Sequence, residues 1–151
     1  MFKHLVVTVL VSLMMCMDFA HAQEVNVSGD NQFIRQYVEA APQNWDTPIM
    51  FVFYDDEYCV ECAAAIRLIY NIYQENYADS IQFFEIDYAL EDEFQLKLTY
   101  DLTQPLSIVV VRIRDGMAQG FYKIDNPQFW MNDPYYFREK IINGINNFLN
   151  M

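Results

Sequence analysis

The feature that most constrains this chain is the motif Cys59-Val60-Glu61-Cys62, which lies between two segments of different periodicity. An apolar run at residues 49–54 comes before it and predicts a short buried strand, and a polar turn at 55–57 joins the two. After the cysteines, apolar residues recur at helical spacing, namely Ile66, Ile69, Tyr70, Tyr73 and Tyr77. A strand, a turn and Cys-x-x-Cys on the first turn of a helix together predict a thiol–disulfide redox site, because helical positions three apart share one face.

This spacing suits the chemistry of the two thiols. Their sulfurs can bond with little backbone movement, and the positive end of the helix dipole, with its free N–H groups, favours a thiolate at Cys59. The alternative is a purely structural disulfide, which would close a very small loop and so stabilise the fold only slightly. Redox function is the favoured interpretation.

Residues 1–22 are predicted to be a secretory signal peptide. Lys3 and His4 precede an apolar run from Leu5 to Met17, and Ala20-His21-Ala22 forms a small-residue cleavage site before Gln23. The run is shorter than the roughly 20 residues of a membrane span. An uncleaved anchor and a lipid-modified Cys16 are the alternatives. We expect an exported protein of the periplasm or cell envelope, without a stable membrane span after cleavage.

The remaining residues, 23–151, are expected to form one domain. Both histidines and Cys16 belong to the predicted signal peptide, so this domain keeps only Cys59 and Cys62. A histidine-assisted nucleophile and a histidine-containing zinc site are therefore excluded, and two cysteines are too few for structural zinc. The glycines form no dinucleotide-binding fingerprint, so no metal and no cofactor besides the Cys59–Cys62 disulfide is expected. A net charge of −12 argues against nucleic acid as a partner.

The rest of the chain predicts an α/β fold. Helix and strand patterns alternate and then end in a hairpin at Asp115-Gly116, which implies a mixed, central four-stranded sheet flanked by helices in a three-layer sandwich. Two side chains of one helix, Phe94 and Leu98, are expected to point inward, whereas Arg112 and Arg114 are expected in solvent. The predicted elements are a helix at 30–41, a strand at 81–87, a helix at 91–98, strands at 106–113 and 117–124, and a helix at 134–149 that starts at Asp133-Pro134.

This pattern resembles the thioredoxin fold. The resemblance rests on the strand at 49–54, the Cys-x-x-Cys motif, the strand end Glu85-Ile86-Asp87, and Gln104-Pro105 before a strand. It covers most of residues 23–151. It implies that Cys59 is the exposed attacking thiol, that Cys62 is the partly buried resolving thiol, and that Pro105 is cis and faces them. Two further residues of the motif region stay open: Tyr58 either shields the disulfide or packs on the sheet, and Glu61 is either solvated or a proton relay.

A narrower likeness is to small exported thioredoxin-like proteins of bacterial arsenic-resistance operons, which are labelled subunits of a nitrophenyl compound nitroreductase. The chain departs from well-known thioredoxins in three respects. The residues between the cysteines are Val60 and Glu61 rather than Gly-Pro or Pro-His. Phe53 stands where they keep a buried Asp that helps Cys62 lose its proton, and acidic residues surround the motif: Asp55, Asp56, Glu57 and Glu61. Because carboxylates disfavour a nearby thiolate, these departures predict a reducing couple.

The leading expectation is an exported thiol–disulfide oxidoreductase that exchanges with protein or small-molecule disulfides, with an envelope protein as its electron donor. One alternative is a non-catalytic thioredoxin-like subunit that binds a partner in a metalloid or nitroaromatic reductase system. Another is arsenite or soft-metal binding by the paired thiols, which offer only two ligands.

Overall fold

The structure, a computed structural model, describes residues 46–55, 57–89 and 94–150. The predicted signal peptide and the predicted helix at 30–41 lie outside these residues. Within them, no helix is long and apolar enough to cross a bilayer.

A mixed four-stranded sheet forms the middle layer. Its strands are β1 (Ile49–Tyr54), β2 (Gln82–Asp87), β3 (Leu106–Arg114) and β4 (Met117–Asp125), and their spatial order is β2-β1-β3-β4. The pair β1–β2 is parallel, because helix α2 (Cys62–Asn76) connects these strands as a crossover. The pairs β1–β3 and β3–β4 are antiparallel, and the latter is the predicted hairpin. The predicted fold class is therefore confirmed.

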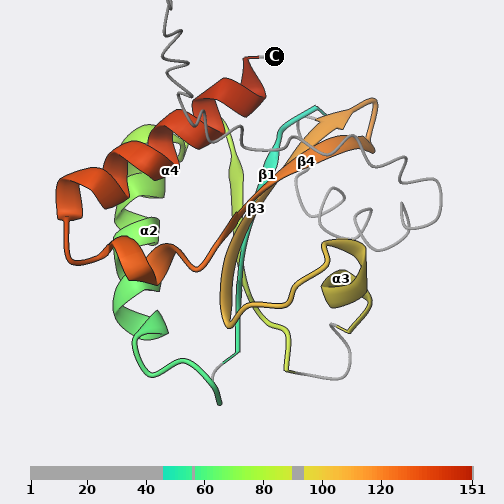
Figure 1. Cartoon of the computed structure of the whole chain (residues 1–151). Helices are drawn as coiled ribbons and strands as arrows, with labels where there is room; N and C mark the ends of the chain where they lie inside the picture. The colour runs from blue at the N-terminus through green and yellow to red at the C-terminus, as the bar shows by residue number, and fades with distance from the viewer. Residues whose placement is uncertain (1–45, 56, 90–93, 151) are drawn as a thin grey trace, which may run out of the picture.

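Helices cover both faces of this sheet. Helix α2 and helix α4 (Pro134–Leu149) lie on one face, and the short helix α3 (Phe94–Thr99) lies on the other (Figure 1). Because successive strand residues point to opposite faces, β1 contributes to two separate cores. Met50 and Val52 pack under α2 and α4, while Phe51 and Phe53 pack in the cluster that includes Leu96 of α3.

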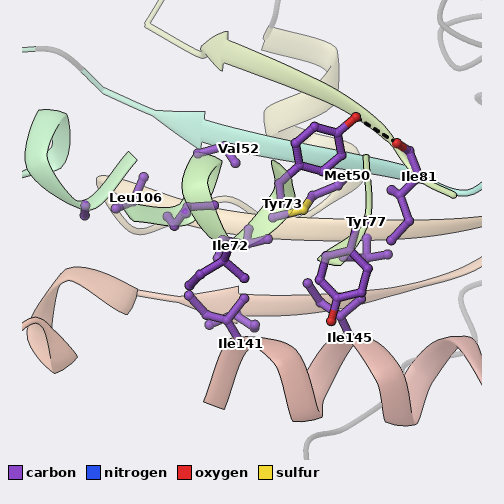
Figure 2. Packing of buried hydrophobic residues seen from close by; sticks show 14 of the residues in the cluster. Met50, Val52, Ile72, Tyr73, Tyr77, Ile81, Leu106, Ile141 and Ile145 are labelled. Carbon is purple, nitrogen blue, oxygen red and sulfur yellow. Dashed lines mark hydrogen bonds between the residues drawn. The ribbon is translucent and has the colours of Figure 1, made fainter. Parts of the chain in front are cut away.

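The core between the sheet, α2 and α4 contains the side chains expected to face inward from α4. These are Phe137, Ile141, Ile145 and Phe148, all buried. Asp133 caps this helix as predicted, since its Oδ1 accepts a hydrogen bond from the Tyr136 N–H at 3.0 Å. Figure 2 shows Ile141 and Ile145 of α4 opposite Ile72 and Tyr77, and the Tyr73 hydroxyl donating to the Ile81 carbonyl at 3.0 Å.

Three expectations about the burial of side chains are wrong. Leu98 is 61% exposed, and Leu96 is the α3 side chain that is buried instead; the side chain of Phe94 is outside the described part. Tyr70 is 43% exposed rather than packed inward, because the buried stripe of α2 runs through Ala65, Ile69 and Ile72. Arg112 is half-buried, since its guanidinium donates to the Phe148 carbonyl and lies over the Phe148 ring.

Candidate functional site

The two cysteines of the motif are joined in a disulfide. Their Cα atoms are 5.3 Å apart, within the usual range for such a bond. The pair lies between the carboxyl end of β1 and the start of α2, at the place predicted from the sequence.

A tight turn holds Cys59 in place. Asp55 Oδ1 accepts from the Glu57 N–H at 3.1 Å, and the Asp55 carbonyl accepts from the Tyr58 N–H at 3.3 Å. Asp55 is thus the turn former that its residue type predicts. The structure differs from the prediction in one respect: α2 begins at Cys62, so Cys59 lies just before the helix, and its carbonyl accepts from the Cys62 N–H at 3.2 Å.

The two sulfurs differ in access to solvent. Cys62 is 3% exposed and belongs to the core under α2, whereas Cys59 is half-buried and borders that core. An incoming thiol can therefore reach Cys59 and cannot reach Cys62 directly. The roles of attacking and resolving thiol, which the resemblance implies, stay a prediction.

Pro105 lies directly beside the disulfide. Its carbonyl oxygen is 3.6 Å from Cys62 Sγ and also accepts from the Asp55 N–H at 2.9 Å. Pro105 is thus where the resemblance expects it, but its peptide bond is not as expected. No peptide bond among the described residues is cis, so the Gln104–Pro105 bond is trans.

Gln104 is held by two residues that the sequence did not single out. The Tyr88 hydroxyl donates to the Gln104 carbonyl at 2.7 Å, and Asn126 Nδ2 donates to Gln104 Oε1 at 2.8 Å. Asn126 has a φ of 52°, in the left-handed region that asparagine tolerates better than most residues. The predicted hairpin already brings the end of β4 next to the start of β3, so the position of Asn126 directly after β4 was a signal that could have found it.

Tyr58 and Glu61 are both exposed. Tyr58 is 78% exposed, so the alternative in which it packs on the sheet is wrong. Glu61 is the N-cap residue of α2, and its side chain makes no capping hydrogen bond. Its exposed position fits a solvated carboxylate.

The electrostatics of the site are dominated by carboxylates. Burial raises the pKa of the Tyr88 phenol above its usual value, and the negative charges of Asp55, Asp87 and Asp125 raise it further. Tyr88 therefore stays a hydrogen-bond donor to Gln104 in neutral solution. Across the described ranges, no cluster of three or more histidine, cysteine or acidic side chains could hold a metal ion.

An α/β sandwich with a Cys-x-x-Cys disulfide where β1 meets α2 defines a thioredoxin-like fold. The structure is similar to a crystal structure of Trxlp from Edwardsiella tarda, with a TM-score of 0.50 and 14% identity over 74% of this chain and 91% of that one. It also aligns with thioredoxin from Trichomonas vaginalis, with a TM-score of 0.48 and 13% identity over 72% and 92% of the two chains. No family model matches the sequence, and neither does any curated protein. The narrower likeness to arsenic-operon proteins stays a prediction.

Proposed function

We propose that this protein is an exported thiol–disulfide oxidoreductase that exchanges electrons with protein or small-molecule disulfides through Cys59 and Cys62. The observation that carries the proposal is the asymmetry of the disulfide. One sulfur is accessible, and the other is buried against the Pro105 carbonyl, with the two already joined.

The exchange follows from this asymmetry. In the dithiol form, the Cys59 thiolate attacks a disulfide of the partner, which forms a mixed disulfide and releases one partner thiolate, which takes up a proton. The Cys62 thiol loses its proton and attacks Cys59 Sγ, which forms the intramolecular disulfide and releases the second partner thiol. Two electrons pass to the partner. A dithiol donor must then reduce Cys59–Cys62 by the reverse steps.

The buried Cys62 thiol is positioned for the second step. In the dithiol form, its S–H can donate to the Pro105 carbonyl, which lies 3.6 Å from the sulfur in the disulfide form. This contact would hold Cys62 next to Cys59. Closing the disulfide then requires no movement of α2.

Insulin reduction by dithiothreitol tests the proposal. We expect the wild-type protein to accelerate insulin precipitation, and Cys59→Ser to reduce the rate to that of dithiothreitol alone, because the attacking sulfur is gone. Glu139→Gln is the control, since it changes an exposed side chain on α4 outside the motif, and it should keep the wild-type rate. An unaccelerated reaction with the wild-type protein would contradict exchange activity.

Partner trapping separates an enzyme from a binding subunit. Cys62→Ser should stall the reaction at the mixed disulfide on Cys59, so envelope extracts should give covalent adducts that dithiothreitol releases. A non-catalytic partner-binding module, the alternative function, would give no covalent adduct on Cys59. Any partner that it captured would be recovered equally well with Cys59→Ser. Exposed apolar side chains at the site, Tyr58 and Val60, are compatible with docking in either case.

A further inference from the structure

A pocket borders the disulfide at Cys62. It has a volume of about 370 Å³ and lies between α2 and the β1–β2 half of the sheet. Tyr54 and Glu85 line it from the strands, and Cys62 lies at one end. Pro105 precedes β3 on the other side of β1 and does not line this pocket.

The pocket exists because small and charged residues stand where a core would need large apolar ones. Glu85 lies on the face of β2 that α2 covers, opposite Val52 of β1, and it is exposed. From α2, the small side chain of Ala63 lines the pocket beside Ile66. The Tyr70 ring also lines the pocket and lies edge-on to Phe83, with ring centroids 5.4 Å apart. The exposed position of Tyr70, unexpected from the sequence, is thus explained by this pocket.

Arg67 brings a positive charge to the rim. Its Nε donates to the Ala63 carbonyl at 3.1 Å, which fixes the side chain and leaves the two terminal nitrogens of the guanidinium for another acceptor. Among the described residues, Arg67 forms no ion pair, although the chain carries a net charge of −12. A guanidinium with this geometry binds a carboxylate through two parallel hydrogen bonds.

We propose that this pocket binds a small aromatic carboxylate with a hydrogen-bond donor at its far end. The carboxylate pairs with Arg67, the ring packs against Ile66 and Tyr70, and the donor reaches the Glu85 carboxylate. The pocket has a volume in the usual range for small-molecule sites, roughly 300–1,000 Å³. Binding needs no thiol and no electron transfer, so it does not depend on the proposed exchange activity.

Titration of the isotope-labelled full chain in its disulfide form, followed by amide chemical shifts, tests this site with 6-hydroxy-2-naphthoate as the probe. We expect saturable binding, with shifts centred on Ile66, Tyr70 and Glu85. Two analogues test the polar contacts: 2-naphthol, which lacks the carboxylate, should bind at least about tenfold more weakly, and 2-naphthoate, which lacks the hydroxyl, should bind a few-fold more weakly.

Three variants complete the test. Arg67→Gln should weaken binding of the probe by at least about tenfold, whereas Arg114→Gln, which removes an exposed arginine at the end of β3, should leave it unchanged. Ala63→Leu should abolish binding because the larger side chain fills the pocket, and its unperturbed spectrum elsewhere would show that the fold is kept. Equal affinities for wild type and Arg67→Gln, or shifts located outside the pocket, would overturn the proposal.

Discussion

Cys59 and Cys62 are three residues apart and differ in exposure. The start of α2 turns Cys62 into the core, where it is 3% exposed, and leaves Cys59 at the surface of the preceding turn. Phe53, at the position where thioredoxins keep an acid, is fully buried in the cluster on the opposite face of the sheet, with its ring 5.7 Å from that of Tyr100. Among the described residues, β1 therefore offers Cys62 no carboxylate from that position.

The carboxylates near the motif are expected to affect the reduction potential of the Cys59–Cys62 couple. Negative charge destabilises the Cys59 thiolate and so favours the disulfide, which predicts a reduction potential more negative than about −150 mV. An exposed charge changes the energy of a neighbouring charge by about 0.5 kcal/mol. Glu61→Gln should therefore make the couple more oxidising by about 10 mV, measured against a glutathione redox buffer.

Glu139→Gln is the matched control for this prediction, because Glu139 lies on α4 and hydrogen-bonds only to Asn143 among the described residues. It should not change the potential. Adding salt should reduce the difference between wild type and Glu61→Gln, since the interaction is exposed to solvent. A wild-type potential in the range of strong oxidants, above about −150 mV, would contradict the expected balance.

At the scale of elements, Tyr77 connects α2 and α4, the two helices that cover the same face of the sheet. It ends α2, and its hydroxyl lies 3.3 Å from the Ile142 carbonyl and 3.1 Å from Asn146 Oδ1, both on α4. Burial raises the pKa of this phenol to about 12, with the nearby Arg138 charge acting in the opposite direction. The link between α2 and α4 therefore requires the protonated phenol.

This link predicts a loss of stability in alkaline solution. The folded state keeps the Tyr77 proton up to about pH 12, whereas the unfolded chain loses it near 10, so the free energy of unfolding falls as the pH rises between these values. By pH 11, Tyr77 alone should account for about 1.4 kcal/mol of this loss. Tyr77→Phe should remove this part of the pH dependence, although it should cost about 1 kcal/mol at pH 7. Urea unfolding at both pH values measures each effect.

The control for this prediction is Tyr135→Phe, since Tyr135 is exposed on the first turn of α4. An exposed phenol titrates similarly in the folded and unfolded states, so this variant should follow the wild-type pH dependence. If Tyr77→Phe also follows it, the buried phenol does not link the helices as inferred.

At the scale of the whole molecule, the net charge does not depend on whether the predicted signal peptide is removed. Lys3 and Asp18 cancel, so removal of residues 1–22 would keep the net charge at −12. The acidic surface favours solubility and works against binding to nucleic acid. Neither consequence depends on where the protein is found.

Cleavage of the predicted signal peptide would give the exported protein one defined N-terminus. Mass spectrometry of the protein purified from the cell envelope should find a chain that starts at Gln23, because the small residues Ala20 and Ala22 suit signal peptidase. Replacing both by leucine should block this cleavage. A chain that keeps Met1, or one that begins at a lipid-modified Cys16, would contradict the cleaved signal peptide.

Local patterns were enough to predict the framework of this fold. The apolar run of β1, the Asp115-Gly116 turn and the Asp133-Pro134 helix start all lie where predicted, because strand periodicity, positive-φ turns and N-caps depend on residues close in sequence. The Cys-x-x-Cys spacing likewise determined that the two sulfurs can bond.

Only the tertiary structure decided how the site is completed. The bond before Pro105 is trans, which the sequence did not predict. Tyr88 and Asn126 hold Gln104 from two other segments of the chain. The pocket that Arg67 lines likewise lies between α2 and two strands. Which sides of α2 and α3 face the sheet was also undecided locally, since Tyr70 of α2 and Leu98 of α3 satisfy helical periodicity yet remain exposed. Such contacts depend on how the elements pack against each other, and the spacing of residues along one element does not specify that packing.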